Sequence, residues 1–163
     1  MSQILRTLKE SFDYVVVDTA PAFDEQTLTA LDETDEIVIV ATLDVPTLKN
    51  VKVALETLDM LNIAQDRRHL LLNRADDEVG ISPDRVESIL GMRPAARVTT
   101  SLEVAAATNA GNPIVAKNPY HPTSTAIIAL ASQLAGEDIA TPVTAGGEQP
   151  AGDQPKRRLR RRR

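Results

Sequence analysis

The sequence predicts an α/β fold in three layers, with helices on both faces of a parallel sheet. A chain of 163 residues is long enough for one domain with a sizeable core. Hydrophobic residues make up 42% of it but aromatic residues only 2%, so the core must be aliphatic. Short runs rich in β-branched residues alternate with segments of helical periodicity. This alternation is typical of a parallel sheet with right-handed crossovers.

Two strands and three helices are predicted in the first 60 residues. Residues 2–11 carry apolar side chains at helical spacing. Tyr14–Val17 and Ile37–Val40 are continuous apolar runs, which predict strands buried on both faces of the sheet. Asp24 can cap a helix that runs to about residue 31. The longest helix starts at position 46 or 47, and its apolar residues form one stripe that predicts core packing. The stripe consists of Leu48, Val51, Leu55 and Leu58.

The next 75 residues continue the alternation. Leu70–Leu72 predicts a third strand, and the polar residues 75–82 predict a loop. A helix is expected from Ser82 to residue 90, where Gly91 stops it. The remaining predicted elements are a strand over 95–98, a helix over 101–108, a turn before Ile114 and Val115, and a helix over 123–134 that ends at Gly136.

The chain is predicted to have three parts, a folded domain over 1–135, a disordered linker over 136–155 and a polybasic tail over 156–163. Proline, glycine, threonine and glutamine dominate the linker, and such compositions do not bury a core. The tail holds seven of the 18 basic residues and no acid. The other 155 residues carry the remaining 11 basic residues and all 23 acidic ones, a net charge of −12. An acidic body is therefore joined to a basic tail.

Several classes of function are excluded or disfavoured. The chain has no cysteine, which excludes disulfides, thiolate metal sites and cysteine nucleophiles. No leader-like apolar stretch and no run of about 18 apolar residues is present, so a soluble cytoplasmic protein is expected. The two histidines, His69 and His121, are far apart and lack partners at metal-ligand spacing, so a structural or surface role is expected for each. Three consecutive acids at 76–78 are expected to be a solvated surface.

The carboxyl ends of the predicted strands are where ligands bind on parallel sheets. Asp18 follows the run Tyr14–Val17, and a carboxylate delivered there can organise Mg²⁺, directly or through water. The alternative is an aspartate that caps the following turn, a common role at such positions. The residues after the other strands are Thr42–Asp44, Asn73–Asp76 and Thr99–Ser101.

Four segments resemble the MinD/ParA-type ATPases. The segment 13–21, DYVVVDTAP, is similar to their switch II (Walker B) sequence. The segments 37–50 and 70–76, together with NAGNPIV over 109–115, resemble the pilus-assembly branch of that family, the CpaE/TadZ type. The resemblance covers about residues 1–135. It implies a P-loop NTPase fold of the SIMIBI class, ATP and Mg²⁺ as ligands, and a homodimer that forms on ATP.

The resemblance also implies roles for individual residues. Asp18 would position Mg²⁺ near the γ-phosphate through water, and Thr19 to Pro21 would sense that phosphate. Asn73 would bind the adenine edge through its carboxamide, which offers both a donor and an acceptor. Arg74 would pack beside the base, and Pro113 would line the base pocket. The alternatives are an ordinary exit from a strand at Asn73 and Arg74, and a simple turn at Pro113.

A phosphate-binding loop is absent from the sequence. None of the seven glycines precedes a lysine, and no glycine-rich loop follows a predicted strand. The backbone cradle and the lysine that hold the β- and γ-phosphates are therefore missing, and Asp18 alone cannot replace them. In the family fold the missing strand lies next to the switch II strand. We therefore expect an incomplete sheet with exposed strand edges, and a chain that works with an upstream half or a partner and does not hydrolyse ATP alone.

The basic tail predicts an electrostatic tether. Its charged residues are Lys156, Arg157, Arg158, Arg160, Arg161, Arg162 and Arg163. Near an anionic membrane each contributes about 1 kcal/mol, so the tail can hold the protein at the inner face of the plasma membrane. The same charges would bind nucleic acid without sequence preference, and a solubilising tail without a target is the third possibility. The functions left open are a localisation ATPase that positions a pilus or secretion assembly, a non-catalytic adaptor, and a ParA-like DNA-partitioning ATPase.

Overall fold

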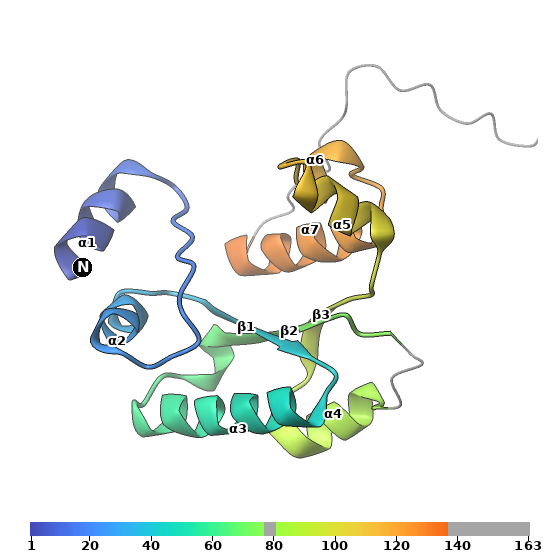
Figure 1. Cartoon of the computed structure of the whole chain (residues 1–163). Helices are drawn as coiled ribbons and strands as arrows, with labels where there is room; N and C mark the ends of the chain where they lie inside the picture. The colour runs from blue at the N-terminus through green and yellow to red at the C-terminus, as the bar shows by residue number, and fades with distance from the viewer. Residues whose placement is uncertain (77–80, 137–163) are drawn as a thin grey trace, which may run out of the picture.

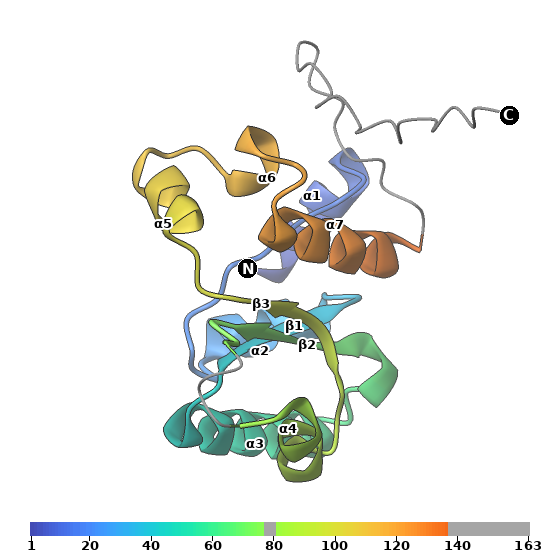
Figure 2. The same ribbon diagram turned by 90° about the vertical axis from the view of Figure 1, so that its right-hand side faces the viewer.

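A computed structural model describes residues 1–76 and 81–136, and the sheet within them has three strands. The strands are β1 (Ile37–Thr42), β2 (Arg68–Asn73) and β3 (Pro94–Val98), in the spatial order β1-β2-β3. Both pairings are parallel. Helices lie on the two faces of the sheet, so the molecule has three layers (Figures 1 and 2). The predicted α/β class and the parallel sheet are confirmed.

Helices connect and flank the strands, and short polar side chains start several of them. The helices are α1 (Ser2–Ser11), α2 (Glu25–Asp32), α3 (Val45–Met60), α4 (Pro83–Leu90), α5 (Leu102–Asn109), α6 (Ile114–Lys117) and α7 (Pro122–Ala135), with a 3₁₀ turn, η1, at Gln65–Arg67. The predicted cap Asp24 accepts a hydrogen bond from the Thr27 N–H at 2.8 Å. Gly91 ends α4 at φ 71°, a left-handed conformation that glycine adopts without a steric penalty. The short α6 was not predicted, because four residues show no periodicity.

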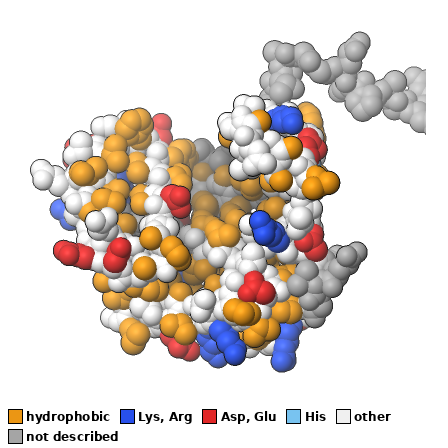
Figure 3. Space-filling view, in the orientation of Figure 1, with side chains coloured by type: hydrophobic (Ala, Val, Ile, Leu, Met, Phe, Trp, Pro, Cys, Tyr) orange, Lys and Arg blue, Asp and Glu red, His pale blue; other side chains and the backbone are white. Residues whose placement is uncertain are grey.

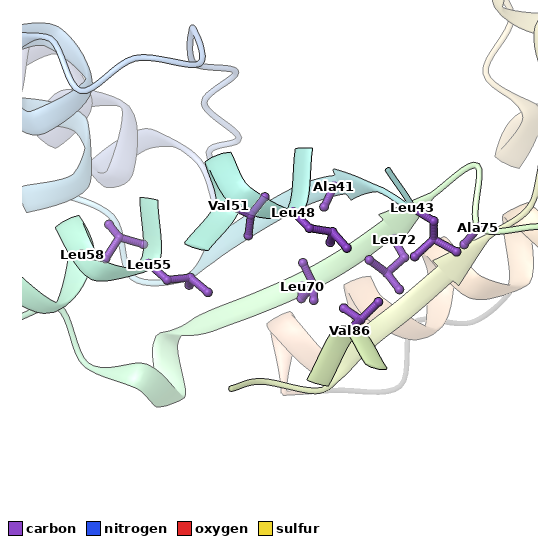
Figure 4. Packing of buried hydrophobic residues seen from close by; sticks show 10 residues of the cluster. All are labelled: Ala41, Leu43, Leu48, Val51, Leu55, Leu58, Leu70, Leu72, Ala75 and Val86. Atoms are coloured by element: carbon purple, nitrogen blue, oxygen red, sulfur yellow. The ribbon is translucent and has the colours of Figure 1, made fainter. Parts of the chain in front are cut away.

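The core lies between the sheet and the helices α3 and α4. All four residues of the predicted stripe on α3 are buried there, which confirms that prediction. Leu70 and Leu72 point from β2 into the same layer and have no exposed surface (Figure 4). Val86 of α4 closes the cluster. On the opposite face, α7 packs over β3.

The predicted strand over Tyr14–Val17 is not formed. The segment is extended between α1 and α2, but it pairs with no described strand, and the side chain of Val16 is 94% exposed. The prediction of two buried faces is also wrong for β1, where Val38 is 38% and Val40 56% exposed. High β propensity does not make a strand without a partner, because an unpaired segment leaves its backbone groups without a ladder.

Helix α1 is held to the turn before β1 mainly through Glu33. The Glu33 carboxylate accepts hydrogen bonds from the Ser2 hydroxyl and from Arg6 Nε, the latter at 2.9 Å. Its backbone carbonyl accepts one from Lys9 Nζ at 2.8 Å. The bonds from Arg6 and Ser2 lower the pKa of Glu33 from 4.5 to about 2. The attachment of α1 therefore depends on an ionised Glu33.

Acid should loosen α1. Because the pKa of Glu33 is lower in the folded protein, its contribution is complete above pH 4.5 and is lost as the pH falls toward 2. NMR amide signals of α1, followed from pH 6 to pH 2, should report this loss. Glu33→Gln should already be loosened at pH 6 and should lack the transition, whereas Glu10→Gln, a change at an exposed position of the same helix, should keep it. An unchanged transition in Glu33→Gln would contradict the assignment.

Candidate functional site

The carboxyl ends of the three strands meet at one edge of the sheet. Thr42, at the end of β1, lies opposite Asn73, and Asn73 lies opposite Val98. The residues that follow these strands are those at which the sequence predicts ligand binding, and parallel pairing brings the three strand ends together as expected. This edge is the candidate site.

Asp44 organises the end of β1. Its carboxylate accepts hydrogen bonds from the Thr42 hydroxyl and from the Thr47 N–H, the latter at 2.8 Å, and it thereby caps α3. The Thr42 hydroxyl, and then the Thr47 N–H, lower the pKa of Asp44. The geometry accounts for Asp44 as a helix cap that fixes the turn between β1 and α3.

Asp76 joins the end of β2 to the end of β3. Its carboxylate accepts hydrogen bonds from the Thr100 N–H at 2.9 Å and from the Thr100 hydroxyl at 2.6 Å, and these bonds lower its pKa. Nearby, the Ala75 N–H donates to the Val98 carbonyl at 2.9 Å. The expectation of a merely solvated surface is therefore wrong for Asp76, while positions 77 and 78 lie outside the described residues. No local pattern signals this contact, since its partner is 24 residues away.

Asn73 and Arg74 lie at the centre of this edge. The Asn73 carboxamide oxygen accepts a hydrogen bond from the Arg74 N–H at 3.0 Å, which fixes the side chain at the strand end. Arg74 has φ 52°, and Asn62 is the other non-glycine residue with positive φ in the described part of the chain. Left-handed backbone costs a residue with a Cβ about 1–2 kcal/mol. The Arg74 side chain is exposed. A strained, exposed arginine beside an ordered carboxamide is the most unusual feature of the edge.

Asp18, Thr19 and Pro21 lie on the extended segment between α1 and α2, and all three are exposed. Within residues 1–76 and 81–136, no group of three acidic or histidine side chains is placed to hold a metal ion. Asp18 therefore belongs to no such group among the described residues. On its own, the described part of the chain fits one contact to a hydrated Mg²⁺ and does not fit a complete Mg²⁺-phosphate site.

Pro113 precedes helix α6, and each of the two histidines contacts neighbouring side chains or backbone. Pro113 is exposed at the N-terminus of α6. His121 caps α7, since its Nδ1 accepts from the Thr123 N–H at 3.1 Å, and its Nε2 lies 3.2 Å from the Ser101 hydroxyl that caps α5. His69 pairs with Glu36 at 2.7 Å. The two histidines have the structural and surface roles that the sequence predicts.

Two shallow depressions lie on the N-terminal helices. One, of about 370 Å³, is lined by α1 and α2, and the other by α1 alone. None of the candidate site residues lines either of them. The predicted linker over 136–155, apart from Gly136, and the tail over 156–163 lie outside the described residues. In the part that is described, every helix is too short or too polar to span a bilayer.

Comparison with known proteins gives one relative among curated sequences and several among solved structures. No protein-family model matches the chain. A putative septum site-determining protein MinD from Emiliania huxleyi is 24% identical over 144 residues, which are 85% of this chain and 52% of that protein. The chain therefore spans about half the length of its curated relative.

The solved structures share the fold. A MinC:MinD cell division protein complex from Aquifex aeolicus matches with a TM-score of 0.73 and 24% identity, over 90% of this chain and 61% of the other. A ParA family ATPase from Chlorobium tepidum TLS matches with 0.71 and 23%, over 77% and 53%. The septum site-determining protein MinD from Pyrococcus horikoshii OT3, complexed with Mg-ADP, matches with 0.70 and 19%, over 82% and 54%.

These matches agree with the resemblance of the sequence to the MinD/ParA-type ATPases. The agreement combines a relative in sequence with a common fold, and it extends over most of the chain. The chain shares the fold of somewhat more than half of each of these solved structures. Sequence and fold together support a relationship of this chain to the MinD/ParA-type P-loop ATPases.

Proposed function

We propose that this chain is the adenine-binding and switch half of a MinD/ParA-type ATPase, active only with a half that supplies the phosphate-binding loop. The observation that carries the proposal is the ordered Asn73 carboxamide beside the strained Arg74 at the carboxyl edge of a parallel sheet. Ligands bind at such edges. The Mg-ADP complex of the Pyrococcus horikoshii protein is a precedent for the ligand within the shared fold.

In this proposal each candidate residue has a defined task. Asn73 hydrogen-bonds the edge of the base, Arg74 packs its guanidinium beside the ring, and Pro113 borders the pocket. Asp18 contributes to holding a hydrated Mg²⁺, and Thr19 to Pro21 respond to the terminal phosphate. The exposed position of Asp18 is consistent with ligands that come from a second half of the protein. Phosphate binding and hydrolysis are assigned to that half, because positioning and charge stabilisation dominate phosphoryl transfer.

The first test combines mass and nucleotide binding on the intact protein isolated from its own cells. An intact mass well above 17.7 kDa is expected. That protein should bind a fluorescent ATP analogue, and Asn73→Ala should weaken binding about tenfold, the effect of losing one to two hydrogen bonds to the base. Arg74→Gly should weaken binding while relieving the backbone strain, so its stability should rise.

Matched variants separate binding from folding. Asn50→Ala changes an exposed asparagine on α3, and Asn62→Gly changes the other residue with positive φ. Neither should affect nucleotide affinity. Equal losses in the Asn73 and Asn50 variants, or no nucleotide binding by a longer native protein, would overturn the proposal. A native mass of 17.7 kDa without nucleotide binding would favour the non-catalytic adaptor.

We further propose that the completed protein positions a pilus or secretion assembly and dimerises on ATP, as the resemblance to the CpaE/TadZ branch implies. The tail from Lys156 to Arg163 would tether it to the inner face of the plasma membrane, since seven basic residues occur in eight positions. Cosedimentation with anionic but not neutral vesicles, lost when the tail is removed, supports the tether. Salt-sensitive DNA binding by the tail without vesicle binding would favour the ParA-like DNA-partitioning role instead.

A further inference from the structure

The His121 ring connects the starts of two helices, and its side chain is only 14% exposed. Its Nδ1 accepts a hydrogen bond from the Thr123 N–H at 3.1 Å, which caps α7. Its Nε2 lies 3.2 Å from the hydroxyl oxygen of Ser101, the residue that caps α5. Figure 2 shows α5, α6 and α7 together on one side of the sheet. One imidazole ring therefore ties two of these helices to each other.

The two contacts determine which ring nitrogen carries the proton when His121 is neutral. A nitrogen that accepts from a backbone N–H carries no hydrogen of its own, so the proton lies on Nε2. The Nε2–H then donates to the Ser101 oxygen, which also accepts from the Val104 N–H at 3.4 Å. A neutral ring thus satisfies both contacts. A ring that is protonated on both nitrogens cannot, because the Nδ1–H would face the Thr123 N–H.

The start of α7 depends on the ring, although the main chain of His121 is held firmly. The His121 N–H donates to the Asn118 carbonyl at 3.1 Å, and the His121 carbonyl accepts from the Thr125 N–H at 3.0 Å. Thr123 is 3% exposed, and its hydroxyl has no partner among the described residues. No side-chain hydrogen bond of Thr123 therefore replaces the bond to Nδ1 if the ring leaves.

The charges around the ring decide what protonation does. Glu103, the charged residue of α5, places its carboxylate 3.9 Å from Nε2 of His121. The elements α6 and β3, which pack against α7, contribute Lys117, which is exposed, and Arg97, which donates to the Ala75 carbonyl at 3.2 Å. A positive ring at the N-terminus of α7 is disfavoured by the helix dipole. The Glu103 carboxylate, by contrast, attracts it.

We propose that His121 is a proton-controlled latch that joins the start of α7 to the start of α5. The neutral ring closes the latch. When a proton from solvent binds Nδ1, the Thr123 N–H loses its acceptor, the ring turns toward the Glu103 carboxylate, and the first turn of α7 is released. Histidine suits this task because it changes its charge between about pH 5 and 8.

The latch lies next to the candidate site. Ser101 ends the segment 99–101 that follows β3, and the adjacent Thr100 is held by Asp76. This segment is therefore fixed by a carboxylate on one side and by His121 on the other. On the face that Figure 3 shows, a hollow separates the region of α5 to α7 from the region of α1 and α2. The inference goes beyond the proposed function, because none of these contacts involves a nucleotide.

The test follows the ¹⁵N-labelled full chain by NMR from pH 8 to pH 5, without nucleotide. At pH 8 the His121 ring should carry its proton on Nε2, and at pH 5 it should carry protons on both nitrogens. The amide signal of Thr123 should shift with the same midpoint as the ring signals. Protection of this amide from exchange should fall about fivefold, the effect of losing one N-cap.

Three variants separate the latch from general effects of pH. His121→Asn supplies a cap that does not titrate, so the Thr123 amide should stay protected over the whole range. His121→Ala should lack this protection at both ends of the range. His69→Gln, at the histidine that pairs with Glu36, is the matched control and should keep the transition.

The proposal is overturned if the neutral His121 ring carries its proton on Nδ1, or if the Thr123 amide does not follow the titration of the ring. It is also overturned if the transition persists in His121→Asn or disappears in His69→Gln. Since no nucleotide is added, failure of the latch is distinguishable from failure of ATP binding.

Discussion

Leu70→Ala is expected to lower the free energy of unfolding by about 2–5 kcal/mol, the range for truncating a buried leucine. Leu70 lies in the central strand β2, has no exposed surface, and contacts the core formed with α3 and α4. The cavity cannot collapse easily, because parallel strands flank β2 on both sides. Since domains of this size are stable by about 5–15 kcal/mol, the variant should be partly unfolded at low denaturant. Urea unfolding followed by far-ultraviolet circular dichroism measures the change.

Leu102→Ala is the control for the same chemical change. Leu102 begins α5 and is 89% exposed, so its removal should alter the free energy by no more than about 0.5 kcal/mol. A comparable loss in both variants would mean that β2 does not lie at the centre of the core. A loss in Leu70→Ala alone is the expected result.

Asp59→Ala is expected to have the second largest effect, a destabilisation of about 1–3 kcal/mol, the usual cost of leaving a buried polar group unsatisfied. The Arg68 side chain is only 4% exposed, and its Nη1 donates to Asp59 at 2.7 Å. Its Nη2 donates to the Ile63 carbonyl, while its Nε has no partner. Truncation of Asp59 therefore leaves a buried cation with one remaining acceptor. The half-exposed position of Asp59 keeps the effect below that of a fully buried pair.

Arg68→Met should be less harmful than Asp59→Ala, although it removes the same ion pair. Methionine keeps most of the buried volume and leaves no charge in the core, and the half-exposed Asp59 can be solvated. Thermal unfolding of the two variants at neutral pH and equal ionic strength decides between the possibilities. If Arg68→Met were the more damaging variant, the ion pair itself, and not the burial of the arginine, would be the stabilising element.

Sequence periodicity predicted most of the elements because the signals for them are local. The stripe on α3 and the limits of α4, set by Ser82 and Gly91, follow from residues within one or two helical turns of each other. The parallel arrangement then placed Thr42 beside Asn73 without further information. The edge of the sheet that forms the candidate site was therefore predictable in outline.

Two predictions failed because the structure at those positions depends on residues far away in the sequence. The Tyr14–Val17 run has the composition of a buried strand, but pairing is a property of two segments, and none of the described strands supplies the second. The contact between Asp76 and Thr100 depends on how two loops approach each other across the sheet edge. The positive φ of Arg74 has a different origin, because it belongs to the local turn after β2 and has no signature in the residue type.

The agreement between the spatial order of the strands and their order in the chain has a kinetic consequence. Each pair of neighbouring strands is joined by a single helical crossover, so β1, β2 and β3 can assemble by two successive local closures. Folding rates rise as contacting residues lie closer in sequence. We therefore expect the three-stranded unit to form early and rapidly. Incorporation of any further strand beside β1 would be a separate, slower event, and its rate would depend on the concentration of the incoming segment when that segment belongs to another molecule.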